Sequence, residues 1–110
     1  MMEFFEHVDI NQRIAFLAAI AYLARVDGDF DQEEKEFFVD LAKLYMLSKD
    51  AAKEAIRVRS EEQVLELVKQ IEDPGLALVL IREMFYLGYE DGDLSDPEIL
   101  FISKVGLTLN

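Results

Sequence analysis

The sequence of 110 residues contains no cysteine, no tryptophan and only two prolines. Without cysteine, the chain can form neither a disulfide nor a thiolate metal site. Its longest apolar run, from Ile14 to Ala24, has 11 residues, whereas a membrane-spanning helix needs about 20. The first residues show no basic and apolar signal-peptide pattern. We therefore expect a cytoplasmic protein that does not insert into a membrane.

Basic residues are also scarce, since 11 Lys and Arg stand against 23 Asp and Glu for a net charge of −12. Nucleic-acid binding requires clustered Lys and Arg that neutralise phosphates, so we expect no nucleic-acid partner. Residues 27–36 hold six acids and one base, and residues 90–98 hold five acids and no base. Each of these windows carries −5, which leaves only −2 for the rest of the chain.

Apolar residues recur at helical spacings, and strand-like alternation is absent, so the sequence predicts an all-α bundle of about six to seven helices. We expect one domain over residues 1–110, with a short N-terminal turn at 1–9 and a core at 10–107. Capping signals predict helix starts at Asp31, at Ser48 or Asp50, at Ser60 and at Ser95, and a capping box of Asp9 and Gln12 at the start of the first helix. Asp73-Pro74-Gly75 breaks the chain before the helix at 75–90. The predicted helices cover about 10–27, 31–46, 48–58, a segment after Ser60, 75–90 and 95–107.

The helix at 10–27 is apolar on every side, which predicts a position at the centre of the bundle. The helix at 75–90 is the second candidate for the centre. In the helix at 31–46 the predicted buried stripe includes Phe37, Phe38 and Leu44. The aromatic residues that we expect in the core of the two central helices are Tyr22, Phe85, Tyr86 and Tyr89.

A motif of the form Asp-Gly-Asp-apolar-x-x-x-Glu occurs twice, at 27–34 and at 91–98, with an offset of 64 residues. Each copy connects a predicted central helix to the next helix. The sequence therefore predicts a pseudo-twofold repeat of helix, acidic turn and helix around the two central helices. If successive helices alternate in direction, both turns lie at the same end of the bundle.

Turn geometry explains part of this motif. A glycine at position 28 or 92 suits the end of a helix, where a positive φ is common, and Glu34 and Glu98 complete capping boxes. Turn geometry does not require the neighbouring Asp residues, which lie at helix C-termini where the macrodipole disfavours anions. Closely spaced carboxylates suit Ca²⁺ or Mg²⁺, with Mn²⁺ as a further option. A solvated acidic face or a patch that docks a partner would explain the same residues.

The two motifs, A-x-x-D-G-D-Φ-x-x-x-E from Ala24 and Y-x-D-G-D-Φ-x-x-x-E from Tyr89, resemble those of the tellurite-resistance TerB family. The helical domain of DjlA-type co-chaperones is similar. The resemblance spans roughly residues 10–107 and implies a metal-binding helical module in a bacterial stress response or an assembly, and not an enzyme. Carried over position by position, the implied metal ligands are Asp27, Asp29, Glu34, Asp91, Asp93 and Glu98.

The remaining candidates for chemistry are few. No cysteine is present, His7 is the sole histidine, and no glycine-rich phosphate loop accompanies the acids, so we expect no enzymatic activity. The one local basic cluster is either a solvated helix face or a docking patch for an acidic partner. An alternative function is therefore a metal-independent adaptor that binds an as yet unidentified protein through its acidic turns or its basic helix, with the oligomeric state left open. The basic cluster consists of Lys49, Lys53, Arg57 and Arg59.

Overall fold

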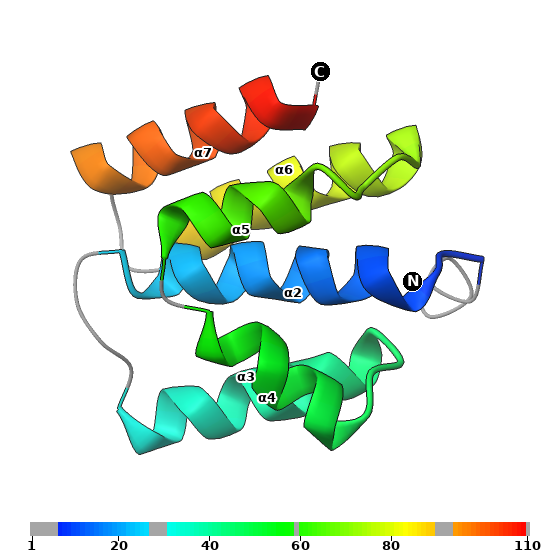
Figure 1. Ribbon diagram of the computed structural model, residues 1–110. Helices are drawn as coiled ribbons and strands as arrows, with labels where there is room; N and C mark the ends of the chain where they lie inside the picture. Colours follow the sequence, from blue (N-terminus) through cyan, green and yellow to red (C-terminus); the bar gives the residue numbers. More distant parts are fainter. Residues whose placement is uncertain (1–6, 27–30, 59, 90–93, 110) are drawn as a thin grey trace.

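The computed structural model describes residues 7–26, 31–58, 60–89 and 94–109, which fold into a bundle of helices (Figure 1). These ranges contain no strand, so the predicted all-α class is confirmed. None of the described helices is long and apolar enough to cross a membrane. The predicted N-terminal turn falls mostly on residues 1–6, outside the described ranges. The helices are α2 (Ile10–Ala24), α3 (Gln32–Leu44), α4 (Lys49–Arg57), α5 (Glu61–Val68), α6 (Pro74–Tyr89) and α7 (Asp96–Leu109).

Helix α2 is the central helix, as its all-round apolar composition predicts. Every residue from Ala15 to Ala21 is buried, and α4, α5, α6 and α7 all pack against it. Figure 1 shows α2 between α5 on one side and α4 on the other. Its alanines allow close approach of neighbouring helices, while Phe16 and Leu17 fill the space between them.

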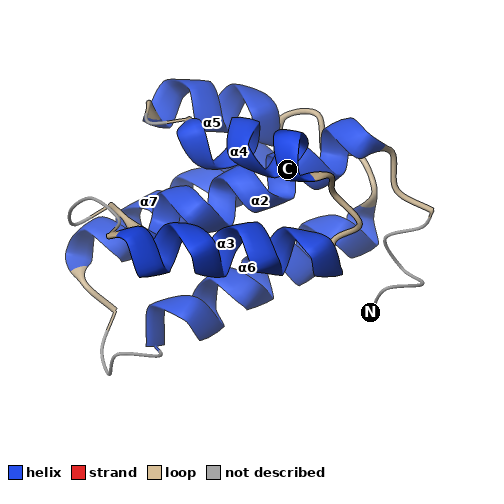
Figure 2. Cartoon of the chain, turned by 90° about the horizontal axis from the view of Figure 1, so that it is seen from below, coloured by secondary structure: helices blue, strands red, loops and turns tan. Residues whose placement is uncertain are grey.

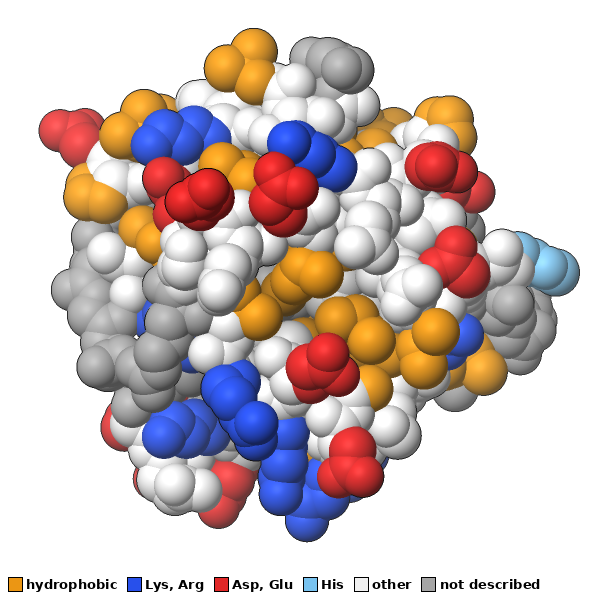
Figure 3. Space-filling view, in the orientation of Figure 1, with side chains coloured by type: hydrophobic (Ala, Val, Ile, Leu, Met, Phe, Trp, Pro, Cys, Tyr) orange, Lys and Arg blue, Asp and Glu red, His pale blue; other side chains and the backbone are white. Residues whose placement is uncertain are grey.

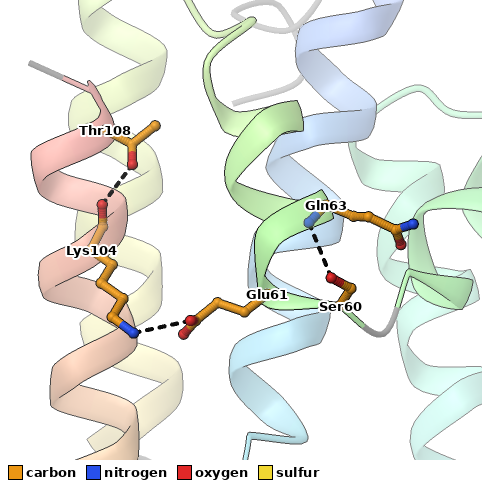
Figure 4. A network of polar contacts seen from close by, with 5 residues as sticks. All are labelled: Ser60, Glu61, Gln63, Lys104 and Thr108. Atoms are coloured by element: carbon orange, nitrogen blue, oxygen red, sulfur yellow. Dashed lines mark hydrogen bonds and ion pairs between the residues drawn. The ribbon is translucent and has the colours of Figure 1, made fainter.

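Predicted capping residues stand at the helix starts, and for α4 the structure decides between the two candidates. Ser48, and not Asp50, caps α4, because its Oγ accepts a hydrogen bond from the Ala51 amide at 3.1 Å. The Ser60 hydroxyl accepts from the Gln63 amide at 3.3 Å (Figure 4). Local hydrogen bonding by short polar side chains therefore explains where most helices start.

At the start of α2 the predicted capping box is wrong in its second half. Asp9 caps the helix by accepting from the Gln12 amide at 3.0 Å, and hydrogen bonds from the side chain and backbone of Gln12 lower the pKa of Asp9. The Gln12 side chain does not return to the Asp9 backbone. Its Oε1 accepts instead from the amides of Glu72 at 3.1 Å and Asp73 at 3.3 Å. Gln12 thus links α2 to the connection between α5 and α6.

Helix α3 ends at Leu44, two residues before the predicted end. Met46 adopts a φ of 57°, and the Leu47 amide donates to the Ala42 carbonyl at 3.0 Å. This is a Schellman ending, in which the left-handed position is most often glycine. Arg13 of α2 donates to the Met46 carbonyl at 2.7 Å, so a tertiary contact holds this turn.

Helices α3 and α6 are less buried than their sequences predict. Phe38 of α3 is buried, but Phe37 is 53% exposed and Leu44 is 52% exposed, so two members of the predicted stripe are wrong. The reason is that α3 packs mainly against α4, and α6 mainly against α2 and α7. Tyr86 on α6 is consequently 68% exposed, although it was expected in the core.

An apolar groove of about 340 Å³ lies between α3 and α6, with Phe37, Leu41 and Tyr86 among its lining residues. Figure 2 shows α5 and α6 on opposite sides of the bundle. Phe85 and Tyr89 are also exposed, whereas Tyr22 is half-buried with its ring 4.8 Å from that of Phe101. Of the four aromatic residues expected in the core, only Tyr22 therefore packs against it.

The last helix is joined to α5 by a tertiary ion pair. Lys104 Nζ lies 3.0 Å from Glu61 Oε2, directly after the Ser60 cap (Figure 4).

Helix α2 packs against four helices and α6 mainly against two, so the two predicted central helices have unlike surroundings. A twofold relation between the halves of the chain stays a prediction from the sequence.

The different burial of Phe16 on α2 and Phe37 on α3 can be tested by mutation. Replacing Phe16 with alanine leaves a cavity in the fully buried centre and should lower the free energy of unfolding by about 3–5 kcal/mol. The matched control is Phe37→Ala on exposed α3, for which we expect a loss of about 0.5 kcal/mol. Urea denaturation followed by circular dichroism measures both values. Equal losses for the two variants would contradict the described core.

Candidate metal centre and the neighbouring basic cleft

Two of the six predicted metal ligands, Glu34 and Glu98, lie within the described residues. The four aspartates, Asp27, Asp29, Asp91 and Asp93, fall outside them. Among the described residues alone, no three His, Asp or Glu side chains are grouped so that they could hold a metal ion. The described part of the candidate centre therefore consists of the helix ends that flank the two acidic turns.

These flanking helix ends lie together. Helices α2 and α6 end, and helices α3 and α7 begin, at the same end of the bundle, on the left in Figure 1. The ring contact between Tyr22 and Phe101 joins the end of α2 to the first half of α7. Alternation of helix direction predicts this arrangement, and the described flanks of both turns agree with it.

Glu34 and Glu98 occupy equivalent positions in the first turns of α3 and α7. The Asp31 amide donates to Glu34 Oε1 at 3.1 Å, and the Glu34 amide donates to Asp31 Oδ1 at 2.8 Å. In the second copy, the Ser95 amide donates to Glu98 Oε1 at 2.8 Å, and the Glu98 amide donates to Ser95 Oγ at 3.2 Å. Both predicted capping boxes are confirmed, and each leaves Oε2 outside the box.

The second turn is anchored by a close contact between Leu94 and Gly88. Gly88 is buried near the end of α6, and a Cβ at this position would overlap Leu94 Cδ2 and lie 3.2 Å from its Cγ. The same Cβ would lie 3.8 Å from Glu98 Oε2. The small residue therefore lets Leu94, at the apolar position of the motif, pack onto the helix. The corresponding residue of the first turn, Phe30, falls outside the described residues.

Arg25 closes α2 immediately before the first acidic turn. Its backbone amide donates to carbonyls in the last turn of α2, and its Nη2 donates to the carbonyl of Val58 at the end of α4. A cation at a helix C-terminus interacts favourably with the macrodipole. Arg25 thus connects the end of α2 to α4 beside the candidate centre.

A basic cleft of about 660 Å³ runs between α3 and α4 next to Arg25. Figure 3 shows the Lys and Arg side chains gathered over these helices at the lower left of the molecule. Sequence analysis grouped three of these cations on α4, but it missed Arg25 and Lys35. No sequence signal joins them to α4, because they come from other helices and only tertiary packing brings them near. The residues that line the cleft are Arg25, Gln32, Lys35, Glu36, Val39, Asp40, Lys49, Lys53, Ile56 and Arg57.

The fold defines a small all-helical module in which the helix ends that flank the two acidic motifs lie at one end of the bundle. A family model described as tellurite resistance protein TerB matches residues 13–110, nearly the whole chain. The chain therefore belongs to the TerB family. No curated protein and no solved structure matches it significantly.

The Leu94 anchor can be tested with two glycines of the described helices. Gly106→Ala in α7 places its Cβ in open space and should gain about 1 kcal/mol from helix propensity. Gly88→Ala has the same intrinsic gain but must displace Leu94, so its free energy of unfolding should lie about 1–3 kcal/mol below that of Gly106→Ala. Thermal unfolding of both variants measures the difference. If Gly88→Ala were as stable as Gly106→Ala, the anchor would be refuted.

Proposed function

We propose that this TerB-family domain binds one or two divalent cations through its acidic turns. The observation that carries the proposal is the charge distribution, because −10 of the net −12 lies in the windows 27–36 and 90–98. The described helices that flank these windows meet at one end of the bundle. Carboxylates that follow a helix C-terminus oppose the macrodipole at a cost of roughly 0.3–1 kcal/mol each. A bound cation would offset that cost.

The donor set fits a hard cation. Asp27, Asp29, Asp91 and Asp93 supply only oxygen ligands, which favour Ca²⁺ or Mg²⁺, and Mn²⁺ after them. Glu34 would act through Oε2, since its Oε1 already holds the Asp31 amide, and Glu98 would act in the same way. When bound, the cation would supply charge neutralisation and a link between turn and helix. The chain's own residues supply the helix caps that position both glutamates.

The physiological role that we propose is that of an assembly module in a cytoplasmic stress response, without enzymatic activity. The family description names tellurite resistance, which supports a stress response. The chain has no cysteine and one histidine, so it has no Cys–His pair, and a Ser–His pair would depend on His7 alone, which supports a binding function. Cation binding would then determine how much negative charge remains on the two acidic turns.

A second candidate function is that of a metal-independent adaptor that docks a protein partner. The observation that favours it is the row of exposed cations on α4, at positions 49, 53 and 57, beside an open cleft. Such a row has no role in the packing of α4, whose buried face consists of other residues. The two functions use different surfaces, so one chain could perform both.

Thermal melts test cation binding directly. In excess EDTA the domain should unfold at its lowest temperature, and Ca²⁺, Mg²⁺ or Mn²⁺ should raise the melting temperature at matched ionic strength. An ion at about 100 times its Kd adds about 2.7 kcal/mol, which corresponds to about ten degrees in a domain of this size. Absence of any shift with all three ions would reject the proposal.

Paired substitutions locate the site. Asp29→Asn with Asp93→Asn should abolish the ion-dependent shift, because each turn loses a ligand. The control is Glu54→Gln with Glu62→Gln, two exposed acids of α4 and α5 that change the net charge by the same amount. We expect this control to keep the full shift. An equal loss in both double variants would indicate screening of the overall charge and no specific site.

A further inference from the structure

The basic cleft between α3 and α4 has an excess of cations that the described fold leaves unneutralised. Apart from Arg25, four cationic side chains line it against two carboxylates, Glu36 and Asp40. Those carboxylates already have partners on α3, since Gln32 donates to Glu36 at 3.5 Å and Lys43 lies 3.4 Å from Asp40. Within the described ranges, Lys35 and the three cations of α4 form no ion pair. The cleft therefore presents positive charge to a ligand from outside.

The three cations of α4 are aligned by the helix itself. Lys49, Lys53 and Arg57 are four residues apart, so they lie on one face of α4, where like charges repel. The opposite face is buried against the bundle through small residues such as Ala52 and Ala55. Because all three cations belong to one helix, the helix repeat fixes the spacing of their positions. An anionic ligand would relieve this repulsion.

The cleft also has an apolar part. Ile56 is buried and Val39 is half-buried, and both line it among the charged residues. A volume of about 660 Å³ is that of a small binding site and accommodates a few side chains. A ligand that alternates acidic and aliphatic groups matches both features of the lining.

The net charge of the whole molecule favours a peptide over a nucleic acid as the ligand of the cleft. A polynucleotide extends well beyond the cleft and would meet the field of a chain with net charge −12. A short segment reaches only the cleft. The local charge and the overall charge together therefore favour an acidic peptide.

We propose that the α3–α4 cleft of this protein binds a short acidic peptide segment of a partner protein, with acidic side chains on Lys35, Lys49, Lys53 and Arg57 and an aliphatic side chain on Val39 and Ile56. This inference rests on the adaptor function and does not require cation binding. It specifies the docking surface and the chemistry of the partner. An adaptor that docked through the acidic turns would not depend on these residues.

Fluorescence anisotropy tests the proposal. The probe is a fluorescein-labelled peptide of alternating glutamate and leucine, titrated with the full chain in EDTA. We expect saturable binding that weakens when NaCl is raised from about 50 mM to about 500 mM, because the contacts are ionic. The same peptide with glutamine in place of glutamate should bind at least about tenfold more weakly.

Charge reversal locates the binding surface. Lys53→Glu with Arg57→Glu should weaken binding of the glutamate peptide by about tenfold or more. The control is Lys69→Glu with Arg82→Glu, on exposed positions of other elements, which changes the net charge by the same amount. We expect the control to bind like the wild type. Circular dichroism of both double variants verifies that they are folded.

Three outcomes would overturn the proposal. The first is equal binding of the glutamate and glutamine peptides, and the second is an equal loss in the two double variants. The third is binding of a single-stranded RNA oligonucleotide with no binding of the peptide. Thermal melts with metal ions are read separately, so failure of the cleft is distinguishable from failure of the cation site. Peptide binding lost only in the control variant would assign docking to a different surface of the adaptor.

Discussion

Burial of the middle of α2, from Ala15 to Ala21, is the constraint on which the rest of the structure depends. A helix that is apolar on every side is stable in water only when other helices cover it. Four helices share that task, and their arrangement determines where every loop lies. Side chains at both ends of α2 reinforce this arrangement, since Gln12 holds the connection before α6 and Arg25 holds the end of α4. The acidic turns and the basic cleft are positioned as a consequence.

Much of this fold could be predicted because its signals are local. Asp31, Ser60 and Ser95 mark helix starts through hydrogen bonds to amides three residues away, which depend on no distant residue. The exposure of Phe37 and Tyr86 could not be predicted in that way. An apolar pattern shows which face of a helix prefers burial, but the number of neighbours that reach that face depends on the whole bundle. The reach of Gln12 to the amides of Glu72 and Asp73 is likewise a tertiary event.

The candidate metal centre likewise has features that local sequence signals predict and features that they do not. The capping roles of Glu34 and Glu98 follow from spacing alone, and the common location of the turn flanks follows from helix alternation. The role of the aspartates rests on charge and on membership of the TerB family. Only part of the basic cleft could be predicted from the sequence. The helical repeat places the cations of α4 on one face, whereas Lys35 lies near them because α3 packs on α4.

The position of Arg25 has a thermodynamic consequence. This residue stands two positions before the first acidic motif in the sequence, and it lines the basic cleft. A cation held by the turn would reduce the negative potential that an anion meets in the cleft. Coupling between two binding sites is reciprocal, so a bound anion would raise the affinity for the cation by the same factor. Two ligands of opposite charge would then act as positive effectors of each other, with no change of fold.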